Sequence, residues 1–174
     1  YPHHPSYYFL IDRDHQDDAF IQKCWDNFPD PDTHNLLVWK RREIENYFLE
    51  PDYLFNSQYC QVSKEALEQK VLEFSKARLF LDAANHVVIA IREELNRNWI
   101  QKFSNPDDFS NKETALQKLK AANEFERHAS NVSQQVSAAE LERRFNQCLE
   151  IMTGGQNEIT FGSGSWLSMI QGKK

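Results

Sequence analysis

Glycine is absent from the first 153 residues of this chain, and its five glycines all lie close to the C-terminus. Phosphate-binding loops of the G-x-x-x-x-G-K-[ST] kind and the G-x-G-x-x-G turn of dinucleotide-binding folds both need glycines ahead of a helix. Neither pattern occurs here. The sequence therefore excludes a nucleotide-binding loop within this chain.

Cysteines and long apolar runs are scarce as well. Cys24, Cys60 and Cys148 are widely spaced and form no C-x-x-C pair, which argues against a disulfide framework and against a zinc knuckle. The longest apolar run, Val87–Ile91, is far below the roughly 18 residues that span a bilayer. We expect a soluble, cytoplasmic protein that makes no membrane contact and has buried thiols.

The net negative charge of the chain comes entirely from its first third. Residues 1–60 hold five Lys and Arg against eleven Asp and Glu, whereas the remaining residues hold fifteen of each. Affinity for a polyanion comes largely from basic side chains, so an acidic region that handles phosphates needs bound cations. The charge pattern favours a metal site and shows no basic groove for DNA.

The first third reads as a pair of parallel strands joined by a helix. Tyr7–Ile11 and Asn35–Trp39 are apolar and aromatic, as is typical of buried strands, and Asp17–Phe28 has apolar residues near helical spacing. A crossover of this length suits a parallel βαβ unit. Because two strands form only a marginal sheet, we expect further strands from a preceding part of the protein that this sequence lacks.

After Pro51 the pattern changes to helices. Apolar residues at i, i+3 and i+4 spacing predict these helices, and Ser137 with Glu140 predicts a capping box at the start of the last long one. The expected elements are helices over Ser63–Ser75, Ala77–Phe103, Ser110–Ala129 and Ala138–Met152, a short strand over Glu158–Phe161 and a helical turn over Trp166–Ile170. The predicted fold class is α/β, a partial parallel βαβ sheet followed by a mostly helical region.

Acidic residues follow each predicted strand. Asp12 and Asp14 come directly after the first strand, and Glu43 and Glu45 follow the second. The carboxyl ends of parallel strands meet at one edge of a sheet, and carboxylate oxygens suit Mg²⁺ or Mn²⁺. Such a set could hold two metal ions that clamp the attacking and leaving oxygens of a phosphodiester. Acidic residues after strands also cap helices, so a purely structural role stays open.

Two stretches together resemble a known family. Tyr8–Asp14, which reads YFLIDRD, and Leu36–Pro51, which reads LLVWKRREIENYFLEP, are similar to the latter half of the Toprim domain of OLD-family (overcoming lysogenization defect) ATP-dependent endonucleases. In that family an apolar strand ends in D-x-D and a later strand leads into an R-E-I-E-N-Y-L-like stretch. The resemblance covers about residues 7–54.

The resemblance implies a metal-dependent nuclease that cuts DNA in defence against phage or foreign DNA. Asp12 and Asp14 match metal ligands, Glu43 or Glu45 falls where further acidic site residues lie, and Lys173 is similar to a late catalytic lysine. ATP would bind only to an N-terminal ABC-type ATPase domain or subunit outside this chain, and the full protein is expected to be a homo-oligomer. Residues 1–56 would be the latter half of a Toprim-like domain, 57–152 a helical region, and 153–174 a segment that returns to the Toprim-like core.

One departure concerns the first strand of Toprim domains, which carries a glutamate that this sequence lacks. We therefore expect the isolated chain to be weakly active or inactive. Two other hypotheses remain. A haloacid-dehalogenase-like phosphatase would use Asp12 as nucleophile, although such enzymes usually have Thr where this chain has Gln16. A non-catalytic helical interaction domain would use its acidic residues only for solubility. The sequence leaves open whether His15 takes part in a site.

Overall fold

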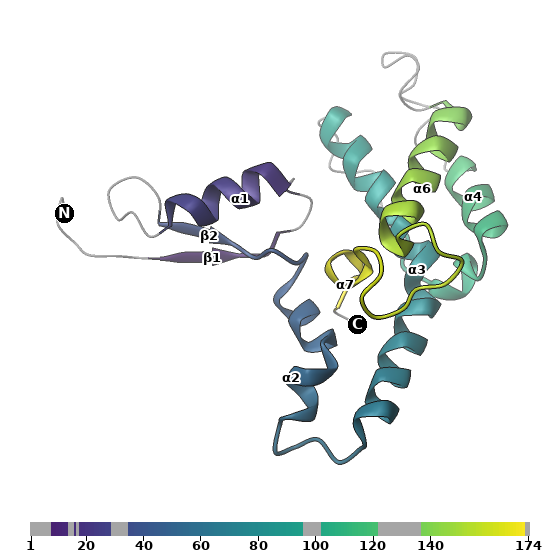
Figure 1. The fold of residues 1–174 in the computed structure, drawn as a ribbon. Coiled ribbons are helices and arrows are strands. Elements are labelled where there is room, and N and C mark those ends of the chain that lie inside the picture. The colour runs from purple at the N-terminus through teal and green to yellow at the C-terminus, as the bar shows by residue number, and fades with distance from the viewer. Residues whose placement is uncertain are drawn as a thin grey trace, which may run out of the picture.

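A parallel pair of short strands forms the N-terminal unit of the protein. The computed structural model describes residues 8–13, 16, 18–28, 35–95, 102–121 and 137–172. Strand β1 (Phe9–Ile11) pairs in parallel with β2 (Leu36–Val38), and Ile11 lies opposite Val38. Helix α1 (Asp18–Asn27) lies between the two strands in the chain and covers β2 (Figure 1). The predicted βαβ unit is therefore present, with both strands ending at the same edge.

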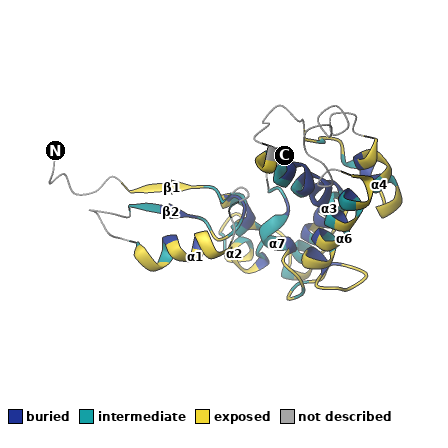
Figure 2. Ribbon diagram, turned by 90° about the horizontal axis from the view of Figure 1, so that it is seen from above, coloured by how far each residue is buried: buried dark blue, intermediate teal, exposed yellow. Residues whose placement is uncertain are grey.

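The expectation that the first strand is buried is wrong for the described part of the chain. Phe9 and Leu10 are each 56% exposed, whereas Val38 on the neighbouring strand is fully buried (Figure 2). The small core of this unit consists of Ile21, Cys24 and Val38. The physical reason is that α1 packs on β2, so it shields little of β1 from solvent.

A 3₁₀ helix and a short α-helix connect this unit to the rest of the molecule. The 3₁₀ helix η1 spans Ile44–Leu49, and α2 spans Pro51–Phe55 with proline at its first position, where a missing N–H costs nothing. Helix α3 then runs without a break over Lys64–Leu95. The sequence prediction of two helices, Ser63–Ser75 and Ala77–Phe103, is wrong here, because no glycine or proline interrupts the pattern between them.

The remaining elements pack against α3 and form a helical body with it. They are the 3₁₀ helix η2 (Pro106–Phe109) and the helices α4 (Lys112–Lys120), α6 (Ala138–Thr153) and α7 (Trp166–Met169). The predicted capping box of the last long helix is confirmed at its N-cap, since Ser137 Oγ accepts from the backbone N–H of Glu140 at 3.2 Å, while the Glu140 carboxylate accepts from Arg143 and Arg144. Residues 122–129 of the predicted helix Ser110–Ala129 lie outside the described residues.

A glycine-rich turn follows α6, and the short strand predicted over Glu158–Phe161 is absent from it. Gly154 ends α6 in the left-handed region with a φ of 65°, which a residue with a Cβ adopts only with strain. The turn is closed locally, because Ser163 N donates to the carbonyl of Thr160 at 3.2 Å. These local bonds take the place of a strand ladder, while Ile159 is buried as an anchor.

The main hydrophobic core lies among the helices and the C-terminal segment. Its largest side chains are Phe109 from η2, Phe145 from α6 and Trp166 from α7, and none of them is more than 2% exposed. Helix α3 packs against α6, α4 and η2, so it is the central helix of the helical body. The molecule is thus mixed α/β and mostly helical, with a two-stranded parallel sheet at one side (Figure 1). None of the described helices has the length and apolar character needed to cross a lipid bilayer.

Truncating the core side chain of α6 tests this packing. We expect Phe145→Ala to lower the free energy of unfolding by about 3–5 kcal/mol, because it leaves a cavity at a fully buried position. Chemical denaturation of both proteins measures the difference. Ile151→Ala is the matched control on the same helix, since Ile151 is 48% exposed and its truncation should change stability little. Equal losses for the two variants would contradict the described core.

Candidate functional site

The edge of the sheet brings the acidic segments together. Trp39 N donates to the carbonyl of Ile11 at 3.1 Å, which aligns the ends of the two strands. Asp12 follows β1, and its Oδ1 accepts from the backbone N–H of Ile44 at 3.3 Å. This contact places Asp12 against residues 42–46, which carry Glu43 and Glu45 and are called the acidic segment below. Asp12 is therefore next to this segment, while the convergence of the carboxylates on one metal ion stays a prediction.

Glu43 has a structural role in this arrangement. Its side chain is buried at 7% exposure and accepts from the backbone N–H of Asn46, while Asn46 Oδ1 accepts from Glu43 N at 3.0 Å. This reciprocal pair is the capping box of η1. Glu43 Oε2 also accepts from Gly172 N at 3.1 Å. The carboxylate thus joins η1 to the C-terminal segment, and the backbone N–H of Gly172 occupies an oxygen that was predicted to face a metal.

The other predicted site residues have different positions. Glu45 is partly buried beside Gly172, where an added Cβ would come within 2.9 Å of the Cβ of Glu45. Asp14, His15 and Lys173 lie outside the described residues. Among the residues that the structure describes, no group of three or more His, Cys, Asp or Glu is placed to hold a metal ion. The metal site that includes Asp14 stays a prediction.

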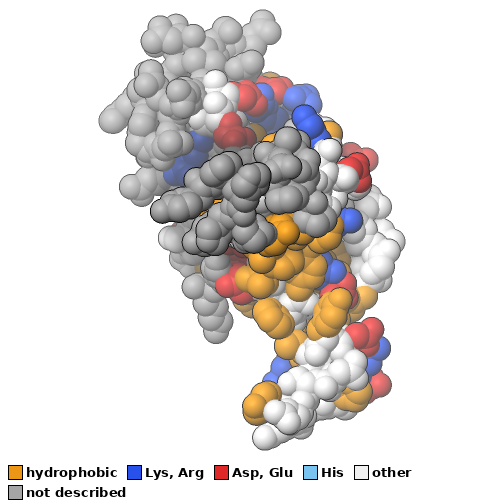
Figure 3. Space-filling view, turned by 90° about the vertical axis from the view of Figure 1, so that its left-hand side faces the viewer, with side chains coloured by type: hydrophobic (Ala, Val, Ile, Leu, Met, Phe, Trp, Pro, Cys, Tyr) orange, Lys and Arg blue, Asp and Glu red, His pale blue; other side chains and the backbone are white. Residues whose placement is uncertain are grey.

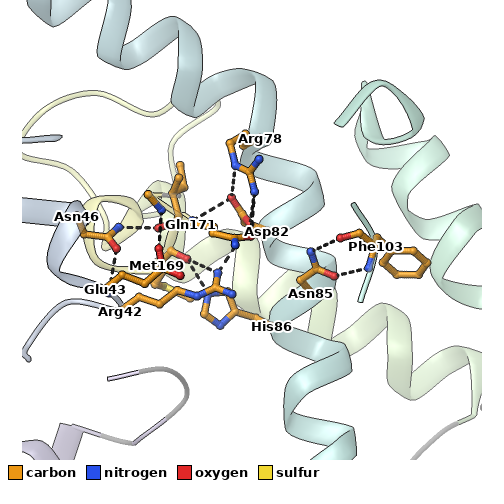
Figure 4. A network of polar contacts seen from close by, with 12 residues as sticks. Arg42, Glu43, Asn46, Arg78, Asp82, Asn85, His86, Phe103, Met169 and Gln171 are labelled. Carbon is orange, nitrogen blue, oxygen red and sulfur yellow. Dashed lines mark hydrogen bonds and ion pairs between the residues drawn. The ribbon is translucent and has the colours of Figure 1, made fainter. Parts of the chain in front are cut away.

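The C-terminal segment is fastened to the acidic segment by buried hydrogen bonds. Arg42 donates through its backbone N to Ser168 O at 2.9 Å and through Nη1 to Met169 O at 3.1 Å. Asn46 Nδ2, in a fully buried residue, donates to Leu167 O at 3.0 Å and to Ile170 O at 2.5 Å (Figure 4). The chain therefore returns to the strand ends just before Lys173.

Asp82 on α3 is the centre of this network and was missed by the sequence reading. Its carboxylate is fully buried, lies 3.7 Å from Arg42 and 3.2 Å from Arg78, and accepts from Gln171 N at 3.2 Å (Figure 4). A buried carboxylate is stable only when charges and hydrogen bonds surround it. The available signal was an aspartate inside an apolar helical stripe, four residues after Arg78.

His86 lies one turn after Asp82 and contacts the same C-terminal segment. Its Nε2 is 2.9 Å from Met169 O, and because a carbonyl oxygen only accepts, Nε2 carries the proton. Burial of the ring and the charge of Arg42 lower the pKa of His86 to about 4, although the Met169 carbonyl opposes the shift. The prediction that His86 is a satisfied histidine at the boundary of the core is confirmed by this contact.

The prediction of buried thiols is correct for two of the three cysteines. Cys24 and Cys148 are buried, Cys60 is partly exposed, and all three are free. Burial raises the pKa of the Cys148 thiol to about 12, so it stays protonated near neutral pH. Neither buried thiol is suited to act as a nucleophile.

Comparisons with known proteins give no relative for this chain. No family model, no curated protein and no solved structure matches it.

Neutralising the buried carboxylate should unfold the network around it. We expect Asp82→Asn to lower the free energy of unfolding by about 3–5 kcal/mol, because Arg42 then keeps a buried charge without its counter-ion. Denaturant titration measures the loss. The double variant Arg42→Met with Asp82→Leu should be more stable than Asp82→Asn, since it removes the buried charge of Arg42 together with its counter-ion, and Arg78 keeps its bond to Gln171. Glu158→Gln, which breaks an exposed pair with Lys76, is the control and should have little effect. A near-neutral Asp82→Asn would refute the network.

The low pKa of His86 predicts an acid-sensitive fold. An unfolded histidine binds a proton near pH 6.5, whereas folded His86 does so only near pH 4, so the unfolded state binds more protons between these values. Stability should therefore fall by about 2 kcal/mol from pH 7 to pH 5. Unfolding curves at both pH values measure this. His86→Gln should reduce the difference, and an unchanged difference in that variant would assign the acid sensitivity to other groups.

Proposed function

We propose that this chain is part of a divalent-metal-dependent nuclease that resembles the OLD-family ATP-dependent endonucleases and hydrolyses phosphodiesters of DNA. The observation that carries the proposal is the hydrogen bond between Asp12 Oδ1 and Ile44 N. It joins the D-x-D motif after β1 to the R-E-I-E-N stretch after β2, which are the two stretches on which the resemblance depends. Ligand sites of parallel sheets lie in the crevice beyond such strand ends.

The donor set fits a hard divalent cation. Asp12 is partly exposed at the strand end and offers carboxylate oxygens, which Mg²⁺ and Mn²⁺ prefer. Asp14 and Glu45 are the further proposed ligands, whereas Glu43 would have to give up its bonds to Asn46 and Gly172. When bound, such a cation would stabilise negative charge on the phosphodiester oxygens. In this proposal Glu43 chiefly positions the segment on which Glu45 lies.

The C-terminal segment is proposed to supply a cation. Gly172, the residue before Lys173 in the sequence, donates its backbone N–H to Glu43. An ammonium group there would attract the substrate phosphate and offset the carboxylates. A Cβ at position 172 would lie 2.9 Å from the Cβ of Glu45 and 3.1 Å from its backbone carbon, so a larger residue would require the acidic segment to shift. This close approach of Gly172 to Glu45 supports the proposed catalytic role of Lys173.

The partners follow from the resemblance. We propose that an ABC-type ATPase domain or subunit binds ATP and controls the nuclease, that the full protein is a homo-oligomer, and that it acts in phage defence. Exposed apolar side chains support a partner for the N-terminal third: Phe9, Phe48, Tyr53 and Tyr59 are between 54% and 81% exposed. Figure 3 views the molecule from the left-hand side of Figure 1 and shows hydrophobic side chains gathered near the middle of that face.

The same exposed residues also favour the second candidate, a non-catalytic interaction domain. In that case the acidic residues serve solubility and η1 capping, as Glu43 does here. The two candidates differ in their response to metal, since only the nuclease gains stability from a divalent cation.

A metal titration tests the proposed function. We expect MnCl₂ at about ten times its dissociation constant to raise the melting temperature of the chain by about 3–6 °C, because binding stabilises only the folded state. Differential scanning fluorimetry measures this shift, and nicking of supercoiled plasmid measures activity. Asp12→Asn should abolish the shift and any nicking.

The matched control is Asp26→Asn, which removes an exposed carboxylate of the same βαβ unit that bonds only its neighbour Gln22 on α1. This variant should respond to metal as the wild type does. The absence of any metal-dependent shift in the wild type would favour the interaction domain. An equal loss in the two variants would show that the cation binds the acidic surface without a specific site.

A further inference from the structure

A small pocket lies between the N-terminal unit and the helical body. Its volume is about 260 Å³, and it is lined on one side by Arg13, which follows β1, and Asp18, the first residue of α1, and on the other by His86 and Ser168. A water molecule takes up about 30 Å³ in the liquid, and whole small molecules usually need about 300 Å³ or more. The pocket therefore suits one polar group of a larger ligand.

Arg13 presents a guanidinium that is fixed in place. Its Nε donates to Gln16 O and its Nη1 to Lys40 O, both at 2.9 Å, and its Nη2 donates to Asp18 Oδ1 at 2.6 Å. The two carbonyl bonds hold the guanidinium plane across the end of the sheet. A planar fork held in this way is suited to binding a phosphate with two parallel hydrogen bonds, because its geometry matches the spacing of two oxygens.

The carboxylate that now faces Arg13 is readily displaced. The side chain of Asp18 is 92% exposed, whereas that of Arg13 is 21% exposed. An exposed ion pair contributes little to stability. An anion that enters the pocket can replace the Asp18 carboxylate on Nη2 while the two carbonyl bonds continue to hold Arg13.

His86 adds a second group that responds to an anion. Because its Nε2 donates to Met169 O, its Nδ1 holds the lone pair. Burial and the charges of Arg42 and Arg13 act against protonation of the ring, while the carboxylate of Asp82 favours it. A bound anion would compensate these charges and raise the pKa of His86, and the protonated ring could then donate from Nδ1.

We propose that this pocket binds one phosphate group of a polynucleotide backbone, with Arg13 as the main ligand and His86 as a second contact. The pocket shares Arg13 with the motif that begins at Asp12, so a phosphate held there lies at the same end of the sheet as the candidate metal site. The assignment of the phosphate to a nucleic acid rests on the proposed nuclease function. The binding of a phosphate group rests only on the pocket and its side chains.

The test follows the ring signals of His86 by NMR in the full 174-residue chain, with EDTA present and ionic strength held constant with NaCl. His86→Gln assigns the signals by their loss. One titration uses sodium phosphate and a second uses a tetrathymidylate without terminal phosphates. We expect both probes to shift the same signals to saturation and to raise the pKa of His86.

Two variants move the affinity in opposite directions. Arg13→Gln should lower the affinity for both probes by about tenfold, because a charge-assisted contact is lost. Asp18→Asn should strengthen both, since it removes the competing carboxylate and leaves the carbonyl bonds of Arg13 in place. Lys118→Gln, which removes an exposed positive charge on α4, is the control and should bind as the wild type does.

Each contrary result has a defined meaning. No saturable shift with phosphate, or Arg13→Gln and Asp18→Asn binding both probes with wild-type affinity, would overturn the pocket. A shift with inorganic phosphate and none with the oligonucleotide would overturn the assignment to a nucleic acid. The phosphate titration is done in EDTA, so a failure of metal-dependent nicking would contradict the proposed function and not the phosphate pocket. Metal-dependent nicking without any phosphate binding would contradict the phosphate pocket alone.

Discussion

The buried carboxylate of Asp82 determines where the candidate site lies relative to the helical body. It faces Arg42, at the start of the acidic segment, and it accepts from the backbone N–H of Gln171 in the C-terminal segment. Three distant parts of the chain therefore meet at one desolvated charge. Since a buried charge is stable only with its partners in place, α3, the C-terminal segment and the acidic segment are held as one arrangement. The positions of Glu43 and Gly172 follow from it.

The same network gives the sheet end two kinds of charge on neighbouring surfaces. Asp12 and the acidic segment offer oxygens to a cation, while burial of the His86 ring, together with the charges of Arg42 and Arg13, lowers the pKa of that histidine. A phosphodiester site needs both kinds, because the substrate is an anion and the catalytic metal is a cation. The acidic excess of the first third is thus compatible with phosphate binding when arginines are fixed beside it.

The two parts of the molecule differ in how much they bury. The helical body encloses a core that includes Phe145 and Trp166, whereas the core of the βαβ unit consists of Ile21, Cys24 and Val38. A parallel sheet normally has both faces covered, and the exposed β1 departs from that rule. The stability of the candidate site therefore comes mainly from the helical body, through the buried bonds of the tail, and little from the sheet itself.

Local pattern alone determined the βαβ unit, the cap at Ser137 and the acidic residues at the strand ends, because helix caps and strand alternation depend on neighbours in the chain. It did not determine that α3 is continuous or that β1 is exposed, since these depend on what packs against each element. Only the tertiary structure decided that Glu43 accepts from Gly172 and that Asp82 faces Arg42. The partners of a buried charge are separated by dozens of residues, and no periodicity in the sequence records that distance.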